Sequence, residues 1–310
     1  MLRTPSRSEA GPVYAARRVG PRVAYDARPA GVLVRVPAPY NLQRTVECGQ
    51  VFRWAVSDGT ATGVFRGRVW TVRQEGTTLR VVGGDGAELE ALLHHLAVDA
   101  PLRSVERALA ADPVLRRTLA HTSGIAIMRQ DPWECLISYV VSAFNNIPKI
   151  RLTVERLSRR FGRPLGGGRF AFPTPSRLAD APLRSLRACL LGYRAPYVQA
   201  VARAVAEGRL DLEALRAQPY AQARGALLSL PGVGEKVAEC VLLFALGCGE
   251  AFPVDVWVQR AVEGLFLRRR ATPRAIRQWA RERFGSLAGY ANQHLFVAAR
   301  TGILGHTSLV

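Results

Sequence analysis

The stretch Leu230-Pro-Gly-Val-Gly-Glu-Lys-Val-Ala-Glu-Cys240 places two glycines directly before a run with helical periodicity. Glycine accepts the backbone angles of a tight turn. Without a Cβ it also lets the backbone N–H groups at the start of the next helix approach an anion. The stretch therefore predicts two helices joined by a turn in which Gly232 and Gly234 bind a phosphate group, a contact that carries no information about base sequence. An ordinary turn between two helices is the alternative interpretation.

Lysine is rare in this chain, and one of its two lysines lies in that stretch. Of 43 Lys and Arg residues only Lys149 and Lys236 are lysine. A lysine amine can lose its proton and attack an electrophilic carbon, whereas arginine stays charged at physiological pH. Lys236 is therefore a candidate nucleophile, although arginine-rich codon usage also explains the composition. Cys240, four residues later, projects from the same face of the helix.

A carboxylate follows the candidate nucleophile. Asp255 comes after Pro253-Val and directly before another helical run, so it is a good N-cap. A helix N-terminus also favours the charged form of a carboxylate, which can stabilise a developing cation. N-capping alone is the alternative. A lysine after the turn and an aspartate nineteen residues later nevertheless favour a catalytic pair of Lys236 and Asp255.

The charge of the chain indicates a polyanionic partner. With 43 basic and 24 acidic residues the 310-residue chain carries a formal charge of +19, which is most often a sign of nucleic-acid binding and less often of an anionic membrane surface. The sequence holds no apolar run of about 20 residues and no apolar leader. We therefore expect an intracellular, soluble protein in the cytoplasm or at the nucleoid of a bacterium. Five scattered cysteines without zinc or iron–sulfur spacing predict reduced thiols and no metal.

The hydrophobic pattern divides the chain into three parts. Residues 1–31 are rich in Arg, Ala, Pro and Gly without a sustained period and predict a basic, flexible tail. The expected class for the rest is α+β: a small antiparallel β-rich domain over 32–120, followed by an all-α domain over 121–310. The first domain has strand-like segments at 32–36, 50–54, 63–73 and 78–82 and a helix at 87–96. The second begins at the capping sequence Asp131-Pro-Trp-Glu134 and predicts helices near 147–161, 183–191, 196–207, 211–228, 235–247, 256–268, 273–284 and 290–300.

Together these residues resemble a known family. The stretch around Lys236, followed by Pro253-Val-Asp255, is similar to the helix-hairpin-helix DNA glycosylases, which carry a glycine- and proline-rich loop and a catalytic aspartate. Further segments resemble one branch, the 8-oxoguanine DNA glycosylases of the eukaryotic type, in a bacterial-like variant. They lie in order between about residues 40 and 300: Gly49-Gln-Val-Phe-Arg-Trp54, Gly63-Val, Val69-Trp70, Arg129-Gln-Asp-Pro-Trp-Glu-Cys135, Asn145-Asn-Ile147, Gly192-Tyr-Arg-Ala-Pro-Tyr197 and Ala288-Gly-Tyr-Ala-Asn-Gln-His-Leu-Phe296.

The resemblance implies an enzyme that removes 8-oxoguanine from double-stranded DNA and then nicks the strand. It implies a monomer that needs no cofactor and no membrane. Lys236 would attack C1′ of the damaged nucleotide and form a Schiff base, Asp255 would stabilise the sugar cation, and β-elimination would follow.

Base removal also requires the nucleotide to leave the stack, so a wedge and a pocket are needed. By resemblance, the Gly49 carbonyl would accept the N7–H that distinguishes 8-oxoguanine from guanine, and Cys240 and Phe296 would sandwich the base. Tyr193 would be the wedge. Asn145 would help hold the opened duplex, and Arg194 would reach the orphaned base.

Four positions depart from the family's pattern. Phe144 stands where eukaryotic members carry the first Asn of a triplet that contacts the orphaned base, and Lys149 stands where they carry Arg. Strict preference for cytosine opposite the lesion is therefore in doubt, and Lys149 is best interpreted as a surface phosphate contact. In the base pocket Trp257 replaces a His, and Asn292 replaces a Gln that reads the base edge. These residues leave undecided whether 8-oxoguanine or a ring-opened purine is the main substrate.

Three other classes of protein share part of this pattern. A relative of endonuclease III would share Lys236, Asp255 and the hairpin, but it should carry a C-terminal cysteine cluster and lack the β-rich domain, and both features argue against it. A monofunctional glycosylase for alkylated bases normally lacks a lysine at position 236. A non-catalytic helix-hairpin-helix module would bind DNA phosphates and have no chemistry to lose in a Lys236→Gln variant.

Overall fold

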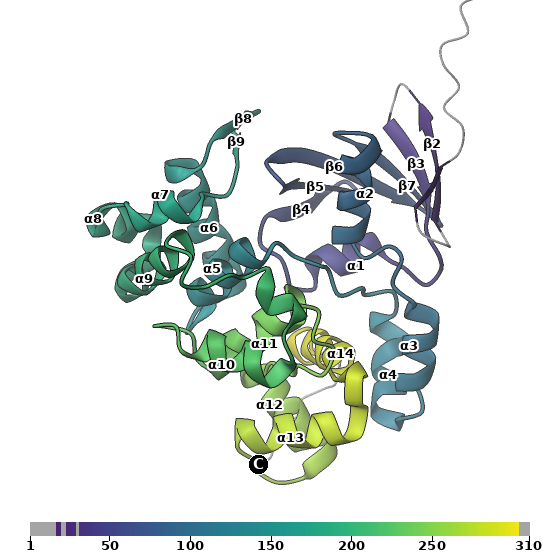
Figure 1. The fold of residues 1–310 in the computed structure, drawn as a ribbon. Coiled ribbons are helices and arrows are strands. Elements are labelled where there is room, and N and C mark those ends of the chain that lie inside the picture. The colour runs from purple at the N-terminus through teal and green to yellow at the C-terminus, as the bar shows by residue number, and fades with distance from the viewer. Residues whose placement is uncertain (1–16, 20–22, 29–30, 304–310) are drawn as a thin grey trace, which may run out of the picture.

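An antiparallel sheet forms the N-terminal part of the protein (Figure 1). The computed structural model describes residues 17–19, 23–28 and 31–303. Seven strands lie side by side in the order β1-β2-β3-β7-β6-β5-β4. Their bounds are β1 (Arg17–Val19), β2 (Val23–Arg28), β3 (Gly31–Arg35), β4 (Trp54–Ser57), β5 (Thr60–Phe65), β6 (Arg68–Glu75) and β7 (Thr78–Val82).

Two of these strands lie in the segment for which a flexible tail was predicted. β1 pairs with β2, and β2 pairs with β3, so both extend the sheet. The prediction is wrong for residues 17–19 and 23–28, because each segment finds its hydrogen-bond partners on a neighbouring strand, which a periodicity search over so short a segment does not reveal. The remaining residues of 1–30 lie outside the described part of the chain.

One face of the sheet is buried because apolar residues alternate along its strands. The buried side chains of β3, β6 and β7 form one core with those of helix α1 (Leu42–Glu47) and helix α2 (Gly86–His95). These are Val32, Val34, Trp70, Val72, Leu79, Val81, Leu42, Val46, Leu89, Leu92 and Leu93.

The predicted strand at 50–54 is wrong, because only its last residue belongs to a strand. Gln50 is buried, and its side-chain amide donates to the carbonyls of Thr45 and Ala126 at 2.8 Å each. Its Oε1 accepts from the Met128 N–H at 2.9 Å. These bonds tie the segment before β4 to the chain that leads into the helical part.

The elements from residue 86 to the end of the described part, at residue 303, are helices as predicted, apart from a small hairpin of β8 (Pro164–Gly166) and β9 (Arg169–Phe170) around three glycines. The predicted helix over 211–228 is divided before Pro219, which cannot continue a helix from 214–217. The helices are α3 (Leu102–Leu109), α4 (Pro113–Thr122), α5 (Pro132–Ser142), α6 (Ile147–Phe161), α7 (Pro175–Ala179), α8 (Leu183–Leu186), α9 (Ala195–Ala206), α10 (Tyr220–Leu228), α11 (Glu235–Phe244), α12 (Val256–Val262), α13 (Pro273–Phe284) and α14 (Ala288–Arg300).

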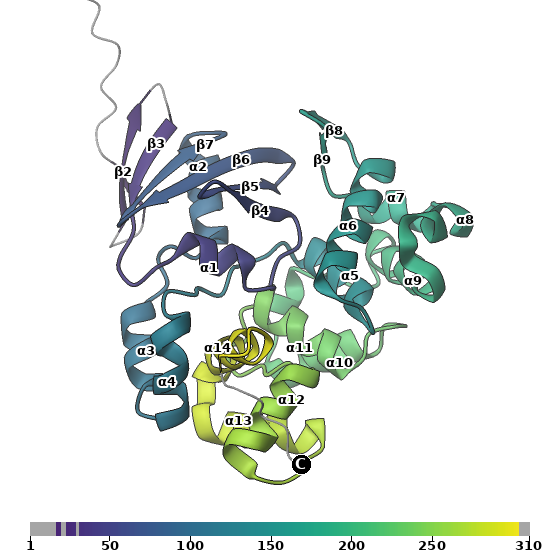
Figure 2. The same ribbon diagram turned by 180° about the vertical axis from the view of Figure 1, so that it is seen from behind.

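Helix α14 lies at the centre of the molecule, with α11 on one side and the pair α3 and α4 on the other, as both views show (Figures 1 and 2). Leu295 of α14 shares a core with residues of α3, α4, α12 and α13. A second helical core joins α5, α9 and α11. The α+β class is confirmed. The domain boundary at residue 120 stays a prediction. Helices α3 and α4, which lie at or before that boundary, share a core with the C-terminal helices.

Candidate active site

A cavity of about 540 Å³ lies where α5, α11, α12 and α14 meet the loop before β4. Eight of the predicted site residues line it: Lys236, Asp255, Gly49, Cys240, Trp257, Asn292, Phe296 and Asn145. The predicted catalytic pair and the predicted base pocket therefore lie in one place, although they come from segments up to about 250 residues apart.

Lys236 projects into the cavity from the first turn of α11. Its Nζ donates to the Ser142 hydroxyl at 3.0 Å and lies 5.0 Å from the centre of the Tyr139 ring. Burial raises the pKa of the Tyr139 phenol well above its ordinary value, so that group stays neutral. The amine thus contacts a hydroxyl and an aromatic face, neither of which carries a formal charge.

Asp255 faces the same cavity as the N-cap of α12. Its Oδ1 accepts the backbone N–H groups of Trp257 at 3.0 Å and of Val258 at 2.9 Å, as the capping prediction requires. Burial raises the pKa of its carboxyl, against the opposing effects of those N–H donors and of the Lys236 charge. The positive charge of Lys236 lowers the pKa of Asp255, but among the described residues the two groups form no direct ion pair. Both groups are therefore available to a third molecule.

Hydrogen bonds to the residues on both sides of Gly49 hold the loop that carries it. The Cys48 carbonyl accepts from Gln293 Nε2 at 3.3 Å, and the Gln50 carbonyl accepts from the Tyr139 hydroxyl at 3.0 Å. Gly49 itself has φ of +97°, in the region that favours glycine. A Cβ there would come within 3.2 Å of the Phe296 ring. The backbone of Gly49 therefore approaches the cavity closely because it has no side chain.

The remaining pocket residues differ in how freely they face the cavity. Cys240 is buried, and burial raises the pKa of its thiol to about 12, so it acts as a small apolar wall. Asn292 is also buried and donates from Nδ2 to the Pro253 carbonyl at 2.8 Å. Phe296 and Trp257 add aromatic surface, the latter partly exposed.

The predicted hairpin is formed by α10, a turn and α11. Gly232 has φ of +80°, and a Cβ on it would lie 2.7 Å from atoms of the Tyr197 side chain. Gly234 is the N-cap of α11 with an extended backbone. Gly232 is therefore required by the turn, whereas the backbone of Gly234 is one that any residue adopts, and the phosphate contact of both glycines stays a prediction.

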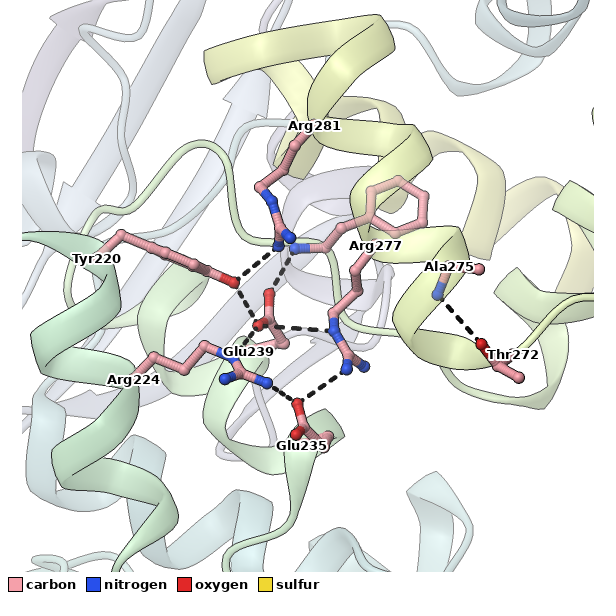
Figure 3. Close-up of polar contacts among 9 residues, drawn as sticks. Tyr220, Arg224, Glu235, Glu239, Thr272, Ala275, Arg277 and Arg281 are labelled. Atoms are coloured by element: carbon pink, nitrogen blue, oxygen red, sulfur yellow. Dashed lines mark hydrogen bonds and ion pairs between the residues drawn. The ribbon is translucent and has the colours of Figure 1, made fainter.

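A buried ionic network fixes this hairpin against α13 (Figure 3). Glu239 of α11 is fully buried and accepts from the Tyr220 hydroxyl at 2.5 Å and from Arg224 Nε at 3.1 Å. Glu235 pairs with Arg224 and, at 2.9 Å, with Arg277 of α13. Since Glu235 and Glu239 flank Lys236 along α11, the network sets the position of the helix that carries the amine.

The predicted DNA-contacting residues lie outside the cavity, apart from Asn145, whose amide donates to the Val141 carbonyl at 3.2 Å. Phe144, Lys149 and Tyr193 are exposed. Arg194 is buried, and its guanidinium donates to the carbonyls of Ala143 and Phe144 instead of facing the surface. The expected contact of Arg194 with an orphaned base stays a prediction.

Two protein-family models together match most of the chain. The model of the 8-oxoguanine DNA glycosylase N-terminal domain matches residues 33–136, and that of the HhH-GPD superfamily of base excision DNA repair proteins matches residues 137–285. A probable N-glycosylase/DNA lyase of Methanothermobacter thermautotrophicus is 34% identical over 217 residues, which cover 62% of this chain and 69% of that relative. The chain belongs to the 8-oxoguanine DNA glycosylase family.

Solved structures of this family are similar over nearly their whole length. The structure of MBOgg1 with a low-affinity DNA ligand is 35% identical in sequence to this chain, with a TM-score of 0.88. The match covers 90% of this chain and 99% of the MBOgg1 chain. The 8-oxoguanine glycosylase/lyase of Clostridium acetobutylicum, in complex with double-stranded DNA containing cytosine opposite 8-oxoguanine, is 30% identical. Its TM-score is 0.87, with coverage of 90% and 98%.

Several residues that line the cavity of this glycosylase family member were not predicted from the sequence. Tyr139 and Ser142 hold the amine, Gln293 holds the Gly49 loop, and Arg151 and Arg300 line the cavity. The two arginines carry no signal in a chain with 41 of them, and the other three are ordinary helix residues. Only the packing of α5, α6, α11 and α14 around one cavity shows that they belong to the site.

Neither a metal centre nor a membrane-spanning helix is found among the described residues. They contain no group of three His, Cys, Asp or Glu side chains that could hold an ion. Within residues 17–19, 23–28 and 31–303, no helix is both long and apolar enough to cross a bilayer.

Proposed function

We propose that this chain removes 8-oxoguanine from double-stranded DNA and then cleaves the strand at the resulting site. The observation that carries the proposal is the shared cavity in which the Lys236 amine and the Asp255 carboxylate face the same space from two helices. DNA complexes of structurally similar glycosylases, including one with 8-oxoguanine opposite cytosine, support the substrate class.

The mechanism follows from the two groups. The neutral Lys236 amine attacks C1′ of the flipped nucleotide, and the damaged base leaves with the electrons of the glycosidic bond. Asp255, ionised, stabilises the positive charge that develops on the sugar as that bond breaks. Opening of the sugar ring gives a Schiff base between Nζ and C1′. Loss of a proton from C2′ then expels the 3′ phosphate by β-elimination.

The pocket residues are assigned roles that fit their surroundings. The Gly49 backbone approaches the cavity closely, which supports its carbonyl as the acceptor for N7–H of 8-oxoguanine. Cys240 and Phe296 supply apolar surfaces for the two faces of the base, while Trp257 and Asn292 shape its edge. Gly232, Gly234 and Lys149 are assigned to DNA phosphates, and Asn145 to the opened duplex.

Borohydride trapping on a duplex with one 8-oxoguanine tests the function. Reduction of the Schiff base leaves a covalent protein–DNA adduct in the wild type, and Lys236→Gln should form none while still binding the duplex. Base release without any adduct would instead identify a monofunctional glycosylase. The absence of both, across other oxidised bases and ring-opened purines, would favour a binding module.

The working form is proposed to be a monomer at the bacterial nucleoid. Lys236 and Asp255, the two groups that the mechanism uses, lie in one cavity of a single chain, so the proposed chemistry needs no residue from a second copy. The net charge of +19 and the DNA substrate support a location on the chromosome. Sedimentation of the protein with and without duplex DNA would test the first part.

A further inference from the structure

Two arginines line the same cavity as Lys236 and Asp255 but take no part in the proposed mechanism. Arg151 projects from α6, and Arg300 is the last residue of α14. Both side chains belong to partly buried residues, and among the described residues neither guanidinium forms an ion pair. Removing a charge from water without a counter-ion costs free energy. The two arginines therefore indicate a site for negative charge that a ligand supplies.

The two guanidinium groups lie close enough to act on each other. Burial lowers the pKa of Arg300, and the charge of Arg151 also lowers it, against the opposing effects of Cys48 and Asp255. The Nε of Arg151 is buried and has no hydrogen-bond partner. Like charges repel each other, and an anion bound beside them relieves that repulsion. An oxygen acceptor that carries negative charge therefore fits this part of the cavity.

Arg300 is held beside the loop that carries Gly49. Its Nη2 donates to the Glu47 carbonyl at 3.3 Å, and its Cζ lies 5.2 Å from the centre of the Phe296 ring. Its Nη1 lies 2.9 Å from the position that a Cβ on Gly49 would take. The Glu47 carboxylate accepts from Gln43 at 3.0 Å. An N–H donor with a positive charge is thus placed next to the backbone whose carbonyl is assigned to N7–H of the lesion.

The C8 oxygen of 8-oxoguanine is the acceptor that such a donor meets. C8 is bonded to N7, so this oxygen lies directly beside the N7–H group, and guanine carries only hydrogen there. When the glycosidic bond breaks, its electron pair passes to N9 of the base. The negative charge then spreads from N9 through C8 onto the oxygen. A cationic donor at this oxygen therefore stabilises the transition state more than it stabilises the bound substrate.

We propose that Arg300 and Arg151 form a leaving-group site, in which Arg300 donates to the C8 oxygen of the flipped base and both guanidinium groups stabilise the negative charge that the departing base acquires. This rests on the proposed function. The released base then takes a proton from water. In a ring-opened purine the bond between C8 and N9 is broken, so the charge cannot spread onto that oxygen. The site therefore favours 8-oxoguanine with its ring closed as the main substrate.

Three single-turnover assays test the proposal: release of 8-oxoguanine, release of ring-opened guanine, and cleavage of a duplex with a preformed abasic site. Arg300→Gln should slow release of 8-oxoguanine about 10²- to 10³-fold, the effect of removing one donor from a developing anion. It should slow release of the ring-opened base much less. Abasic cleavage should keep the wild-type rate, because no base departs, and that rate also shows that the variant is folded. Arg300→Lys keeps the charge and should lose less than Arg300→Gln.

A matched control and a binding measurement complete the test. Arg151→Gln should show the same pattern as Arg300→Gln with a smaller loss, since only Arg300 is placed beside the Gly49 loop. Arg159→Gln removes an exposed charge from the same helix outside the cavity, and all three rates should stay unchanged. In a Lys236→Gln background, Arg300→Gln should weaken binding of the 8-oxoguanine duplex by a smaller factor than it slows base release, because the charge develops only as the bond breaks.

The outcomes separate this site from the proposed function. Wild-type base release in Arg300→Gln, an equal loss for the two bases, an equal loss in abasic cleavage, or a loss of affinity as large as the loss of rate would each overturn the leaving-group site. Each of these outcomes leaves the proposed function intact. A wild type that releases neither base and cleaves no abasic duplex would refute both.

Discussion

The buried carboxylate of Glu239 offers a quantitative test of how the hairpin is held. Its Oε1 accepts from Tyr220 and Arg224, and its Oε2 accepts the Phe252 N–H at 2.9 Å (Figure 3). Glu239→Gln keeps the shape but removes the charge and points an amide N–H₂ at groups that are themselves donors. Breaking a buried pair by removing one partner costs about 3–5 kcal/mol of stability. Because the Arg224 side chain is 25% exposed and keeps Glu235 as a partner, we expect about 3 kcal/mol.

Glu235→Gln is the matched control. The Glu235 side chain is 49% exposed and contacts the same Arg224, so its loss should cost only about 0–1 kcal/mol. Urea denaturation followed by tryptophan fluorescence measures both variants. Borohydride trapping should also slow in Glu239→Gln, because α11 carries Lys236 three residues before Glu239. Equal destabilisation by the two substitutions would refute the view that burial makes Glu239 the anchor.

Four further predictions concern the cavity. Gly49→Ala should slow base release while sparing AP-lyase activity on an abasic site, because its Cβ would lie 2.9 Å from Ile147 Cδ1 and 3.2 Å from the Phe296 ring, in the space assigned to the base; equal loss in both assays would contradict this. Asp255→Asn should keep the helix cap and the stability at neutral pH, yet reduce base release by about 10²–10³-fold. Burial raises the pKa of Asp255, so its carboxylate forms only at a higher pH than an ordinary aspartate requires. On acidification, wild-type activity should therefore begin to fall at a higher pH than it would with an ordinary aspartate. An acid limb of the pH–rate profile at the ordinary aspartate pKa would contradict this. Iodoacetamide at pH 8 should leave activity intact, because a Cys240 thiol with a pKa of about 12 is almost wholly protonated; rapid inactivation would show a reactive thiol.

Local signals in the sequence anticipated the elements well but not their partners. Asp131 caps α5 as predicted, with its Oδ1 2.8 Å from the Glu134 N–H. Glu134, which in a capping box would bond back to the N-cap backbone, instead pairs with Arg53 at 3.1 Å. The competing guanidinium is 81 residues away in sequence, so no local pattern could reveal it. The strands β1 and β2 were missed for a related reason, because their hydrogen-bond partners lie on other strands.

The predicted role of Arg194 shows the same limit. The family resemblance implies that it reaches the orphaned base, a contact that stays a prediction. In the structure its guanidinium turns to the carbonyls at the end of α5, about 50 residues earlier. A long side chain can satisfy its donors in either direction, and only the packing of α9 against α5 decides which.

The sequence by itself determined the α+β class, the hairpin with Gly232 and Gly234, and Lys236 and Asp255 as the candidate pair. These depend on short-range rules of turns, caps and helical periodicity. The tertiary structure alone decided that the Gly49 loop, α5, α11, α12 and α14 enclose one cavity, that Ser142 and Tyr139 hold the amine, and that Arg194 supports Phe144. Such contacts join segments far apart in the chain, and their geometry follows from the close packing of the cores, which no local pattern encodes.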